Sequence, residues 1–125
     1  MEFSVIQDRS FFILENFMPS VIAYASLSKN LRNSKNTYKK LIQHCKNLDE
    51  PCDIYSEEAD PDSSTRNLWD HVIQRIKSGE VKILIVPNVF HIAGDAQKLQ
   101  PVLSLCETNH TKLQIIDVHG GGLWI

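Results

Sequence analysis

The sequence has 125 residues, of which 42% are hydrophobic and 22% are charged. This length and composition fit one ordinary globular domain, and they exclude a two-domain enzyme and a disordered or low-complexity chain. Thirteen basic and fifteen acidic residues leave a net charge of -2, which excludes the broad positive field that draws proteins nonspecifically onto nucleic acid.

The first predicted elements are a strand, a helix and a second strand. Ser20–Tyr24 is a short apolar, β-prone run followed by a polar cluster, which is typical of a buried strand that leads into a loop. Cys52–Tyr55 is a second run of this kind. Between them, apolar residues recur at helical spacing and predict an amphipathic helix. Those residues are Leu31, Tyr38, Leu41, Ile42, Cys45 and Leu48.

The middle of the chain predicts a loop, a helix and a strand. Glu57–Thr65 has the turn chemistry of an exposed loop. Leu68–Ile76 shows helical spacing, and the helix is expected to end at Ser78-Gly79 because glycine is common just past a helix end. Lys82–Val86 is an apolar, β-branched run that predicts a strand buried on both faces of a parallel sheet.

The last predicted elements are another helix and another strand. Val89–Gly94 is a loop or the lead-in to a helix. Asp95 can cap a helix with apolar residues up to Cys106, although Pro101 favours a first turn later than Asp95. Lys112–Val118 is the final strand.

This alternation from residue 20 onward predicts a three-layer α/β domain with a mostly parallel sheet of four to five strands. The domain is expected to span 20–125. Residues 1–19 lie outside the alternation, and their two apolar stretches predict an N-terminal β-hairpin extension. The glycines of His119–Gly122 are expected to form a flexible turn.

Three cysteines, Cys45, Cys52 and Cys106, form an odd set in a chain that opens without a signal-peptide pattern. We therefore expect reduced thiols in the cytoplasm rather than a disulfide framework. Cys106 with His110, and His44 with Cys45, offer zinc-ligand side chains without the usual paired spacing, so no metal site or other cofactor is expected. The longest apolar runs have four residues, far fewer than the ~20 of a membrane helix, which predicts a soluble protein.

Several segments together resemble the catalytic domain of serine recombinases of the resolvase and invertase family. The run Tyr24-Ala25-Ser26-Leu27-Ser28 is similar to the Tyr-x-Arg-Val-Ser motif that opens this domain. An acidic loop that ends in Arg66-Asn67-Leu68 resembles the family's loop before its second helix. Gly79–Val86 and Lys112–Ile116 resemble the two strands that follow. The resemblance spans Ser20–Val118 and implies a resolvase-like fold.

The resemblance also implies the position of a catalytic site, and it implies that most of the charged residues of that site are missing. In this family a serine attacks a DNA phosphodiester while arginines surround the phosphate; Ser28 matches that serine and Arg66 one of the arginines. The remaining three arginines and one aspartate are replaced. Their positions hold Ser26, Phe90, His91 and Gly94. Because one well-placed arginine can be worth roughly 10³–10⁵ in rate, we expect Ser28 and Arg66 to be vestigial and the chain to be without useful catalysis.

Position alone also permits plainer interpretations of these residues. Ser28 follows a strand, where serines usually serve as turn or capping residues. Arg66 precedes a helix, where it is either a solvated charge, a partner of Asp60 or Asp62, or part of an anion site at the helix start. His91 is expected to be a neutral loop histidine, since the alternative of a protonated phosphate donor needs a lower pH.

The sequence therefore predicts a non-catalytic recombinase-like domain that contacts proteins, either a second copy of itself or a partner in a phage or mobile-element circuit. The family's dimer-forming helix and DNA-binding part are not seen after Val118, so weak or no DNA binding is expected. Two alternatives stay open: a divergent recombinase that uses Ser28, and a small anion-binding α/β module. Apolar residues near both ends of the sequence are expected to form the interaction surface. These are Phe3, Val5, Phe11, Ile13, Leu123 and Trp124.

Overall fold

The centre of the sheet is β2 (Val21–Ser26), a strand in which all six residues are buried. It pairs in parallel with β3 (Cys52–Glu57) on one side and with β4 (Ile83–Val86) on the other, and β5 (Lys112–Ile115) pairs in parallel with β4. The computed structural model describes residues 19–28, 34–61 and 66–116. Within these residues the sheet has four strands in the order β3-β2-β4-β5, so the expected parallel sheet is confirmed.

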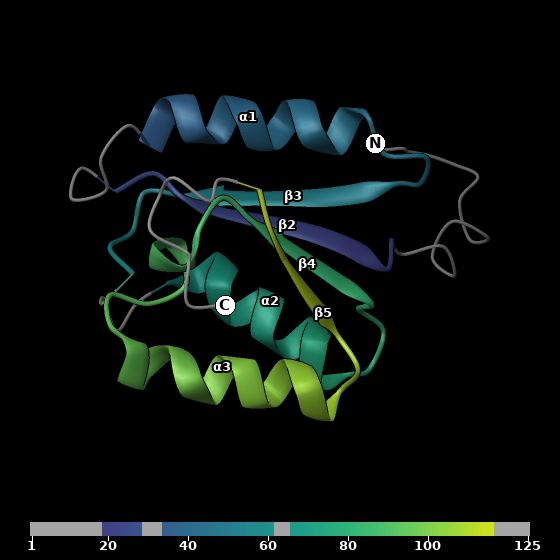
Figure 1. The fold of residues 1–125 in the computed structure, drawn as a ribbon, viewed down its shortest axis with the longest axis vertical. Coiled ribbons are helices and arrows are strands. Elements are labelled where there is room, and N and C mark those ends of the chain that lie inside the picture. The colour runs from purple at the N-terminus through teal and green to yellow at the C-terminus, as the bar shows by residue number, and fades with distance from the viewer. Residues whose placement is uncertain (1–18, 29–33, 62–65, 117–125) are drawn as a thin grey trace.

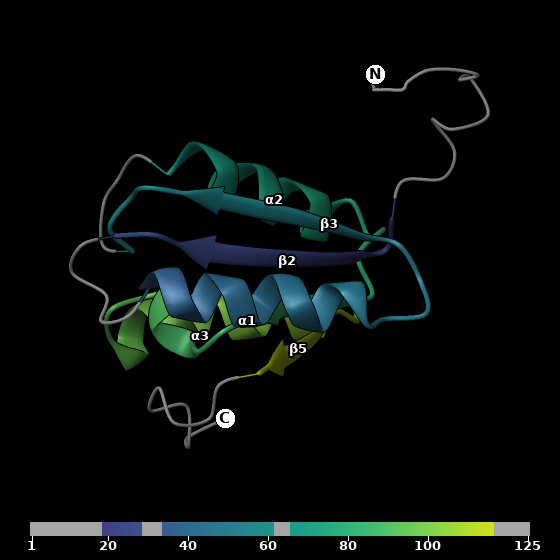
Figure 2. The ribbon, with the colours of Figure 1, turned by 90° about the horizontal axis from the view of Figure 1, so that it is seen from above.

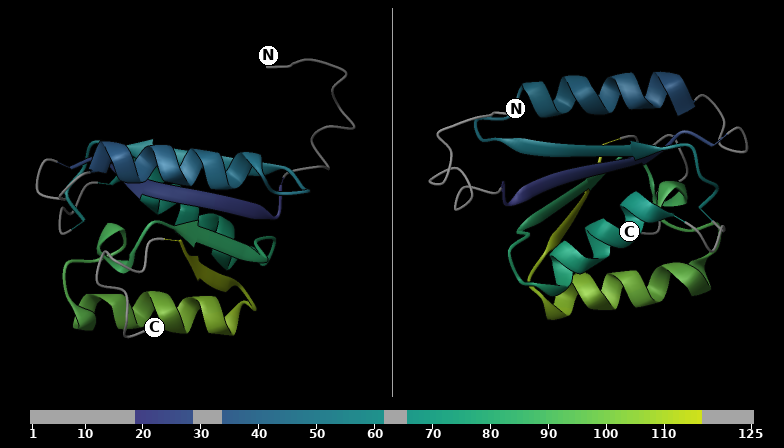
Figure 3. Two further views of the ribbon diagram at one scale, coloured as in Figure 1. Left: turned by 45° about the horizontal axis from the view of Figure 1, so that its top comes forward. Right: turned by 180° about the vertical axis from the view of Figure 1, so that it is seen from behind.

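Helices cover both faces of this sheet and give the domain three layers (Figure 1). Among the described helices, α1 (Ser34–Lys46) lies on one face, while α2 (Asn67–Lys77) and α3 (Ala96–Thr108) lie on the other (Figure 3). A short 3-10 helix, η2 (Val89–His91), follows β4. Figure 2 shows β2 and β3 running in the same direction between α1 and α2. The three-layer α/β fold expected from the sequence is therefore confirmed, and none of the described helices has the length and apolar character to cross a membrane.

Alternate residues of β2 face opposite helical layers, as the pleat of a strand requires. Val21, Ala23 and Ala25 pack against α1, in a cluster that includes Leu41. Ile22 and Tyr24 point to the other face, into a larger apolar cluster. The buried members of that cluster from α2 and α3 are Trp69, Val72, Ile76, Leu99 and Cys106. Both faces of β2 are buried for this reason, and a continuous apolar run is the pattern that such a strand needs.

Two strands are longer than the sequence indicates. β2 continues past Tyr24 to Ser26, and β3 continues past Tyr55 to Glu57. The register pairs Ser26 with Glu57, so the backbone ladder extends through residues whose polarity suggested a loop. Their side chains find hydrogen-bond partners inside the protein, which removes most of the cost of burying them.

The first helix is shorter than the apolar stripe that predicts it. Leu48 lies beyond the end of α1 but still packs against the cluster on the α1 face. Leu31 lies outside the described residues. The same is true of 1–18, which holds nearly all of the predicted hairpin, and of 117–125, which holds the end of the last predicted strand and the glycine turn.

The start of α3 confirms that Asp95 caps this helix, and the later first turn that Pro101 favours is not observed. α3 begins directly after Asp95, whose carboxylate accepts a hydrogen bond from the backbone N–H of Lys98 at 2.8 Å. Pro101 lies inside the helix and cannot donate to the carbonyl of Gln97. Both residues are exposed, so water can hydrate that carbonyl and the helix continues.

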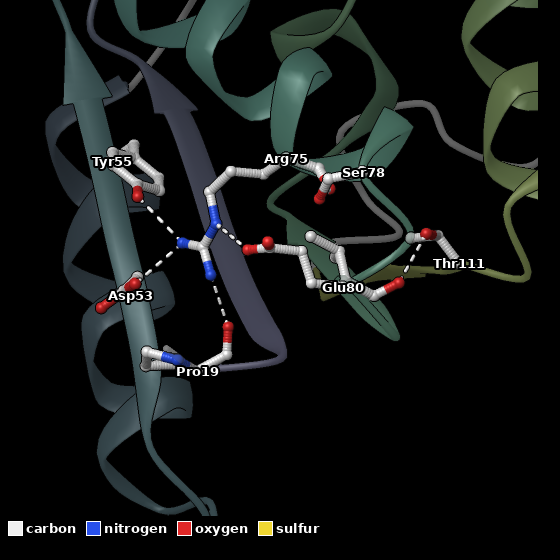
Figure 4. Close-up of polar contacts among 8 residues, drawn as sticks. Pro19, Asp53, Tyr55, Arg75, Ser78, Glu80 and Thr111 are labelled. Atoms are coloured by element: carbon white, nitrogen blue, oxygen red, sulfur yellow. Dashed lines mark hydrogen bonds and ion pairs between the residues drawn. The ribbon is translucent and has the colours of Figure 1, made fainter. Parts of the chain in front are cut away.

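One buried arginine ties α2 to the amino ends of the strands (Figure 4). Arg75 is 4% exposed, and one of its terminal nitrogens donates to the carboxylate of Asp53 at 2.8 Å and to the hydroxyl of Tyr55 at 2.9 Å. The other donates to the carbonyl of Pro19 at 2.5 Å, just before β2. Glu80 lies 3.6 Å from the third nitrogen. The guanidinium thus fixes α2, β3 and the start of β2 relative to one another, at the end of the sheet away from the candidate site.

Candidate functional site

The polar residues singled out in the sequence follow the carboxyl ends of β2 and β4. The chain passes from β2 to β3 and then returns to β4 on the other side of β2, so the strand order reverses between β2 and β4. Open parallel sheets bind ligands at such a switch point. Ser26 and Ser28 lie at the end of one strand, and His91 lies in η2 after the other. The fold therefore brings two separate segments to the place where a site is expected.

Ser26 is a buried link between three segments. Its backbone N–H donates to Nδ1 of His91 at 2.9 Å, and its hydroxyl donates to the carbonyl of Ala59, in the loop after β3. The backbone N–H of Ser28 donates to the Ser26 hydroxyl oxygen at 3.4 Å. The residue at an arginine position of the family motif thus holds the site together and contributes no charge.

His91 is a neutral, interior histidine in this arrangement. It is 2% exposed. Its Nδ1 accepts the hydrogen bond from Ser26, so Nδ1 carries no proton, and the proton of the neutral ring is assigned to Nε2. The interpretation as a neutral histidine is therefore supported over that of a protonated phosphate donor.

Arg66 points into the protein. It is 8% exposed, and its Nη1 and Nη2 donate to the backbone carbonyls of His91 and Ile92 at 3.2 and 2.8 Å. The guanidinium carbon lies 4.9 Å from the centroid of the Trp69 ring, within range of a cation–π contact. The expectation of a solvated charge is wrong, because Arg66 is buried and the carbonyls at the end of η2 accept its donors. Asp62 lies outside the described residues.

Glu57 closes the amino end of α2. Its carboxylate accepts hydrogen bonds from the backbone N–H groups of Leu68 and Trp69 at 3.1 and 2.9 Å, and from the hydroxyl of Tyr24 at 2.6 Å. Helix amino ends favour anions, and here the protein's own carboxylate takes that place. No sequence pattern indicates this role, because the partners of Glu57 are fixed by strand register and not by local spacing.

Burial and the bond to Glu57 raise the pKa of Tyr24 well above its usual value. The phenol therefore stays protonated and remains a donor throughout the physiological range. Tyr24 also contacts Trp69, with ring centroids 4.9 Å apart. Arg66 therefore lies beside the aromatic pair of Tyr24 and Trp69, and Tyr24 is hydrogen-bonded to the Glu57 carboxylate.

Of the other predicted site residues, some lie in the hydrogen-bonded cluster formed by Ser26, His91 and Arg66, and some lie around it. Ser28 is 7% exposed and lies within the cluster. Phe90 is half-buried and packs against the larger apolar cluster, and Gly94 is exposed. The six predicted interaction residues near the chain ends lie outside the described residues. Within the described ranges, no group of three or more histidine, cysteine or acidic side chains is placed to hold a metal ion.

Solved structures of two serine recombinases and of one transposon protein share this architecture. The C-terminal catalytic domain of ISC1926 TnpA, an IS607-like serine recombinase, has a TM-score of 0.65 and 10% identity over 78% of this chain and 70% of that chain. The protein of the first open reading frame in transposon ISC1904 from Sulfolobus solfataricus P2 has a TM-score of 0.64 and 16% identity over 78% and 66%. A serine recombinase from Sulfolobus solfataricus has a TM-score of 0.63 and 17% identity over 78% and 69%.

These similarities establish the fold of the chain. It has the fold of serine recombinase catalytic domains, as the resemblance of its motifs implies. No protein-family model matches the sequence, and no curated protein matches it closely enough to be significant. The chain covers between 66% and 70% of the length of these three structures, so the activities of those proteins do not transfer with the fold.

Proposed function

We propose that this domain does not cleave DNA and acts through protein contacts, as a recombinase-like module of a mobile-element circuit in the cytoplasm. The observation that carries the proposal is the orientation of Arg66. Its two terminal nitrogens donate to carbonyls of the same chain, and the residue is 8% exposed. Phosphoryl transfer needs such donors directed at the phosphate oxygens, where one arginine can contribute roughly 10³–10⁵ in rate.

The surroundings of Ser28 support the same conclusion. Ser26, Phe90, His91 and Gly94 stand where the family motif has charged residues, and His91 is neutral in the observed hydrogen-bond arrangement. The amino end of α2 is filled by the Glu57 carboxylate, which would repel an incoming phosphate. These features also argue against a small anion-binding module.

The experiment is a search for a covalent protein–DNA adduct. Purified protein is incubated with supercoiled DNA and with duplexes of the native mobile element, and the products are separated on a denaturing gel beside an active serine recombinase. No adduct is expected from the wild type or from Ser28→Ala. An adduct that appears with the wild type and vanishes in Ser28→Ala would contradict the proposal and establish a divergent recombinase, with its arginines supplied by another subunit.

The proposed partner is a second copy of the chain or an active recombinase into whose assembly this domain enters. The proposed contact surface is the set of apolar residues near the chain ends, because a monomer seldom leaves more than a few hundred Å² of continuous apolar surface in water. The test is Phe11→Ser combined with Ile13→Ser, analysed by analytical ultracentrifugation and by co-purification with the host's recombinases. Gln43→Ser, on the exposed face of α1, is the control.

Loss of a dimer or of a co-purifying recombinase at unchanged thermal stability supports this surface. An unfolded variant, or one whose association equals that of the control, refutes it. Binding to ordinary duplex DNA is expected to be no tighter than the ~10⁻⁴–10⁻⁶ M of nonspecific complexes at physiological salt.

A further inference from the structure

Two of the three cysteines lie against each other, on the face of the sheet opposite to α2 and α3. Cys45 is in the last turn of α1 and Cys52 is the first residue of β3. The Sγ of Cys52 lies 3.4 Å from the Sγ of Cys45 and donates to it, and both cysteines are free thiols. Spacing along the sequence did not predict this pair, since the contact depends on how α1 packs over the edge strand.

We propose that Cys45 and Cys52 are a redox modification site that forms a reversible intramolecular disulfide on reaction with a small disulfide oxidant such as glutathione disulfide. A disulfide bond is about 2.0 Å long, so the two sulfurs must approach by about 1.4 Å from their present separation. Rotation of the Cys52 side chain at the rim of the cluster can supply much of this movement, because Cys52 is only half-buried.

The backbone on either side of the pair is fixed. The Cα of Cys52 pairs with that of Val21 in the sheet. The chain after α1 turns back through backbone bonds to the last helical turn, including one from Leu48 N–H to the Cys45 carbonyl at 3.3 Å. The two cysteines are therefore held together by the fold and do not meet only by chance fluctuation.

Cys106 provides an internal comparison. It is buried in the larger cluster, on the side of the sheet covered by α2 and α3, so the sheet separates it from the pair. Burial raises the pKa of Cys106, which lowers its reactivity as a nucleophile. Oxidation by a small disulfide is thus expected to select Cys45 and Cys52.

The proton shared by the pair favours the reaction. The bond from Cys52 lowers the pKa of Cys45 and raises that of Cys52, so the pair releases its first proton more readily than an isolated thiol and retains the second between the sulfurs. The retained proton can move along the hydrogen bond between the two sulfurs, and while it lies on Cys45 the more exposed sulfur, that of Cys52, is the thiolate that attacks.

The reaction then has two displacement steps. The Cys52 thiolate attacks one sulfur of glutathione disulfide, whose S–S bond breaks and releases one glutathione thiolate. That thiolate takes the proton of Cys45, and the Cys45 thiolate attacks the Cys52 sulfur and displaces the second glutathione, which takes up the first proton of the pair. Two cysteine thiols are oxidised by two electrons, and one glutathione disulfide is reduced to two glutathiones.

The test uses the full chain, titrated with mixtures of reduced and oxidised glutathione and then denatured under acid quench. Intact-mass spectrometry is expected to show a loss of two hydrogens, with one free thiol left in place of three, and peptide mapping should join the segments of Cys45 and Cys52. Cys106→Ser is the matched control and should still form the disulfide. Cys45→Ser and Cys52→Ser should not.

A second readout covers variants that fold poorly. Oxidation of the wild type should raise its melting temperature by roughly 10 °C, because the disulfide closes a short loop in the unfolded chain, and dithiothreitol should reverse the rise. Three free thiols throughout the titration, stable glutathione adducts without ring closure, or a disulfide that includes Cys106 would each overturn the proposal. None of these results depends on whether the domain cleaves DNA.

Discussion

Replacing Arg75 with methionine should lower the free energy of unfolding by about 2–4 kcal/mol. Loss of one partner from a buried ion pair commonly costs ~3–5 kcal/mol, and Arg75 is 4% exposed. Asp53 and Glu80 are 37% and 48% exposed, so water can solvate these carboxylates in the variant, and this reduces the penalty. The carbonyl of Pro19 and the hydroxyl of Tyr55 still lose their donor.

The assay is urea denaturation followed by circular dichroism, with a thermal scan as a second measure. A loss of this size corresponds to a fall in melting temperature of roughly 10–25 °C for a domain of this kind. Glu80→Gln is the control, because its contact with Arg75 is 3.6 Å long and solvated, and it should change stability by less than about 1 kcal/mol. If Arg75→Met lowers the free energy of unfolding no more than Glu80→Gln does, Arg75 does not stabilise the packing of α2 against β2 and β3 as inferred.

Three further predictions concern other elements. Arg66→Met should lower the free energy of unfolding by about 2–3 kcal/mol in urea titrations, because two buried carbonyls lose their donors; a variant with wild-type stability but weaker phosphate binding would instead identify a ligand-binding arginine. Pro101→Ala should raise the stability of α3 by roughly 1–3 kcal/mol, since it restores a backbone donor at an exposed site, and a destabilised variant in the same titration would speak against this. Tyr24 should escape ultraviolet phenolate titration in the native protein. Because its folded pKa is raised, its contribution to stability is complete below the unfolded pKa of about 10 and declines progressively as the pH rises from there toward the folded pKa. An early native phenolate signal that is absent from Tyr24→Phe would contradict the buried bond to Glu57.

The sheet could be predicted because its inner strands are continuous apolar runs. Val21–Ala25 and Leu84–Val86 are buried on both faces, and short β-branched runs of this kind are typical of inner strands in a parallel sheet. Strand ends were harder to predict because Ser26 and Glu57 are polar residues that the ladder includes. Their burial depends on hydrogen-bond partners in other elements, and these partners cannot be predicted from residue type alone.

The candidate site shows the same division. The motif placed Ser26 and Ser28 at the end of one predicted strand and His91 after another, and the fold makes these strands neighbours and brings the residues together. The inward orientation of Arg66 was not predictable, because its acceptors lie 25 and 26 residues later in the chain. An arginine before a helix normally meets solvent or an anion, and only the path of the chain after β4 provides the carbonyls that hold it inside.

The order of the strands also has a consequence for how the chain folds during synthesis. β2 and β3, with α1 between them, form a parallel unit that can assemble once residue 57 has been made, but the opposite edge of β2 waits for β4. At ~5–20 residues per second, the 26 residues from Glu57 to Ile83 leave that edge unpaired for roughly one to five seconds. During this interval the unpaired edge of β2 can accept a strand of another chain, so edge contacts with a neighbouring nascent chain would form first at the strand that later becomes the centre of the sheet.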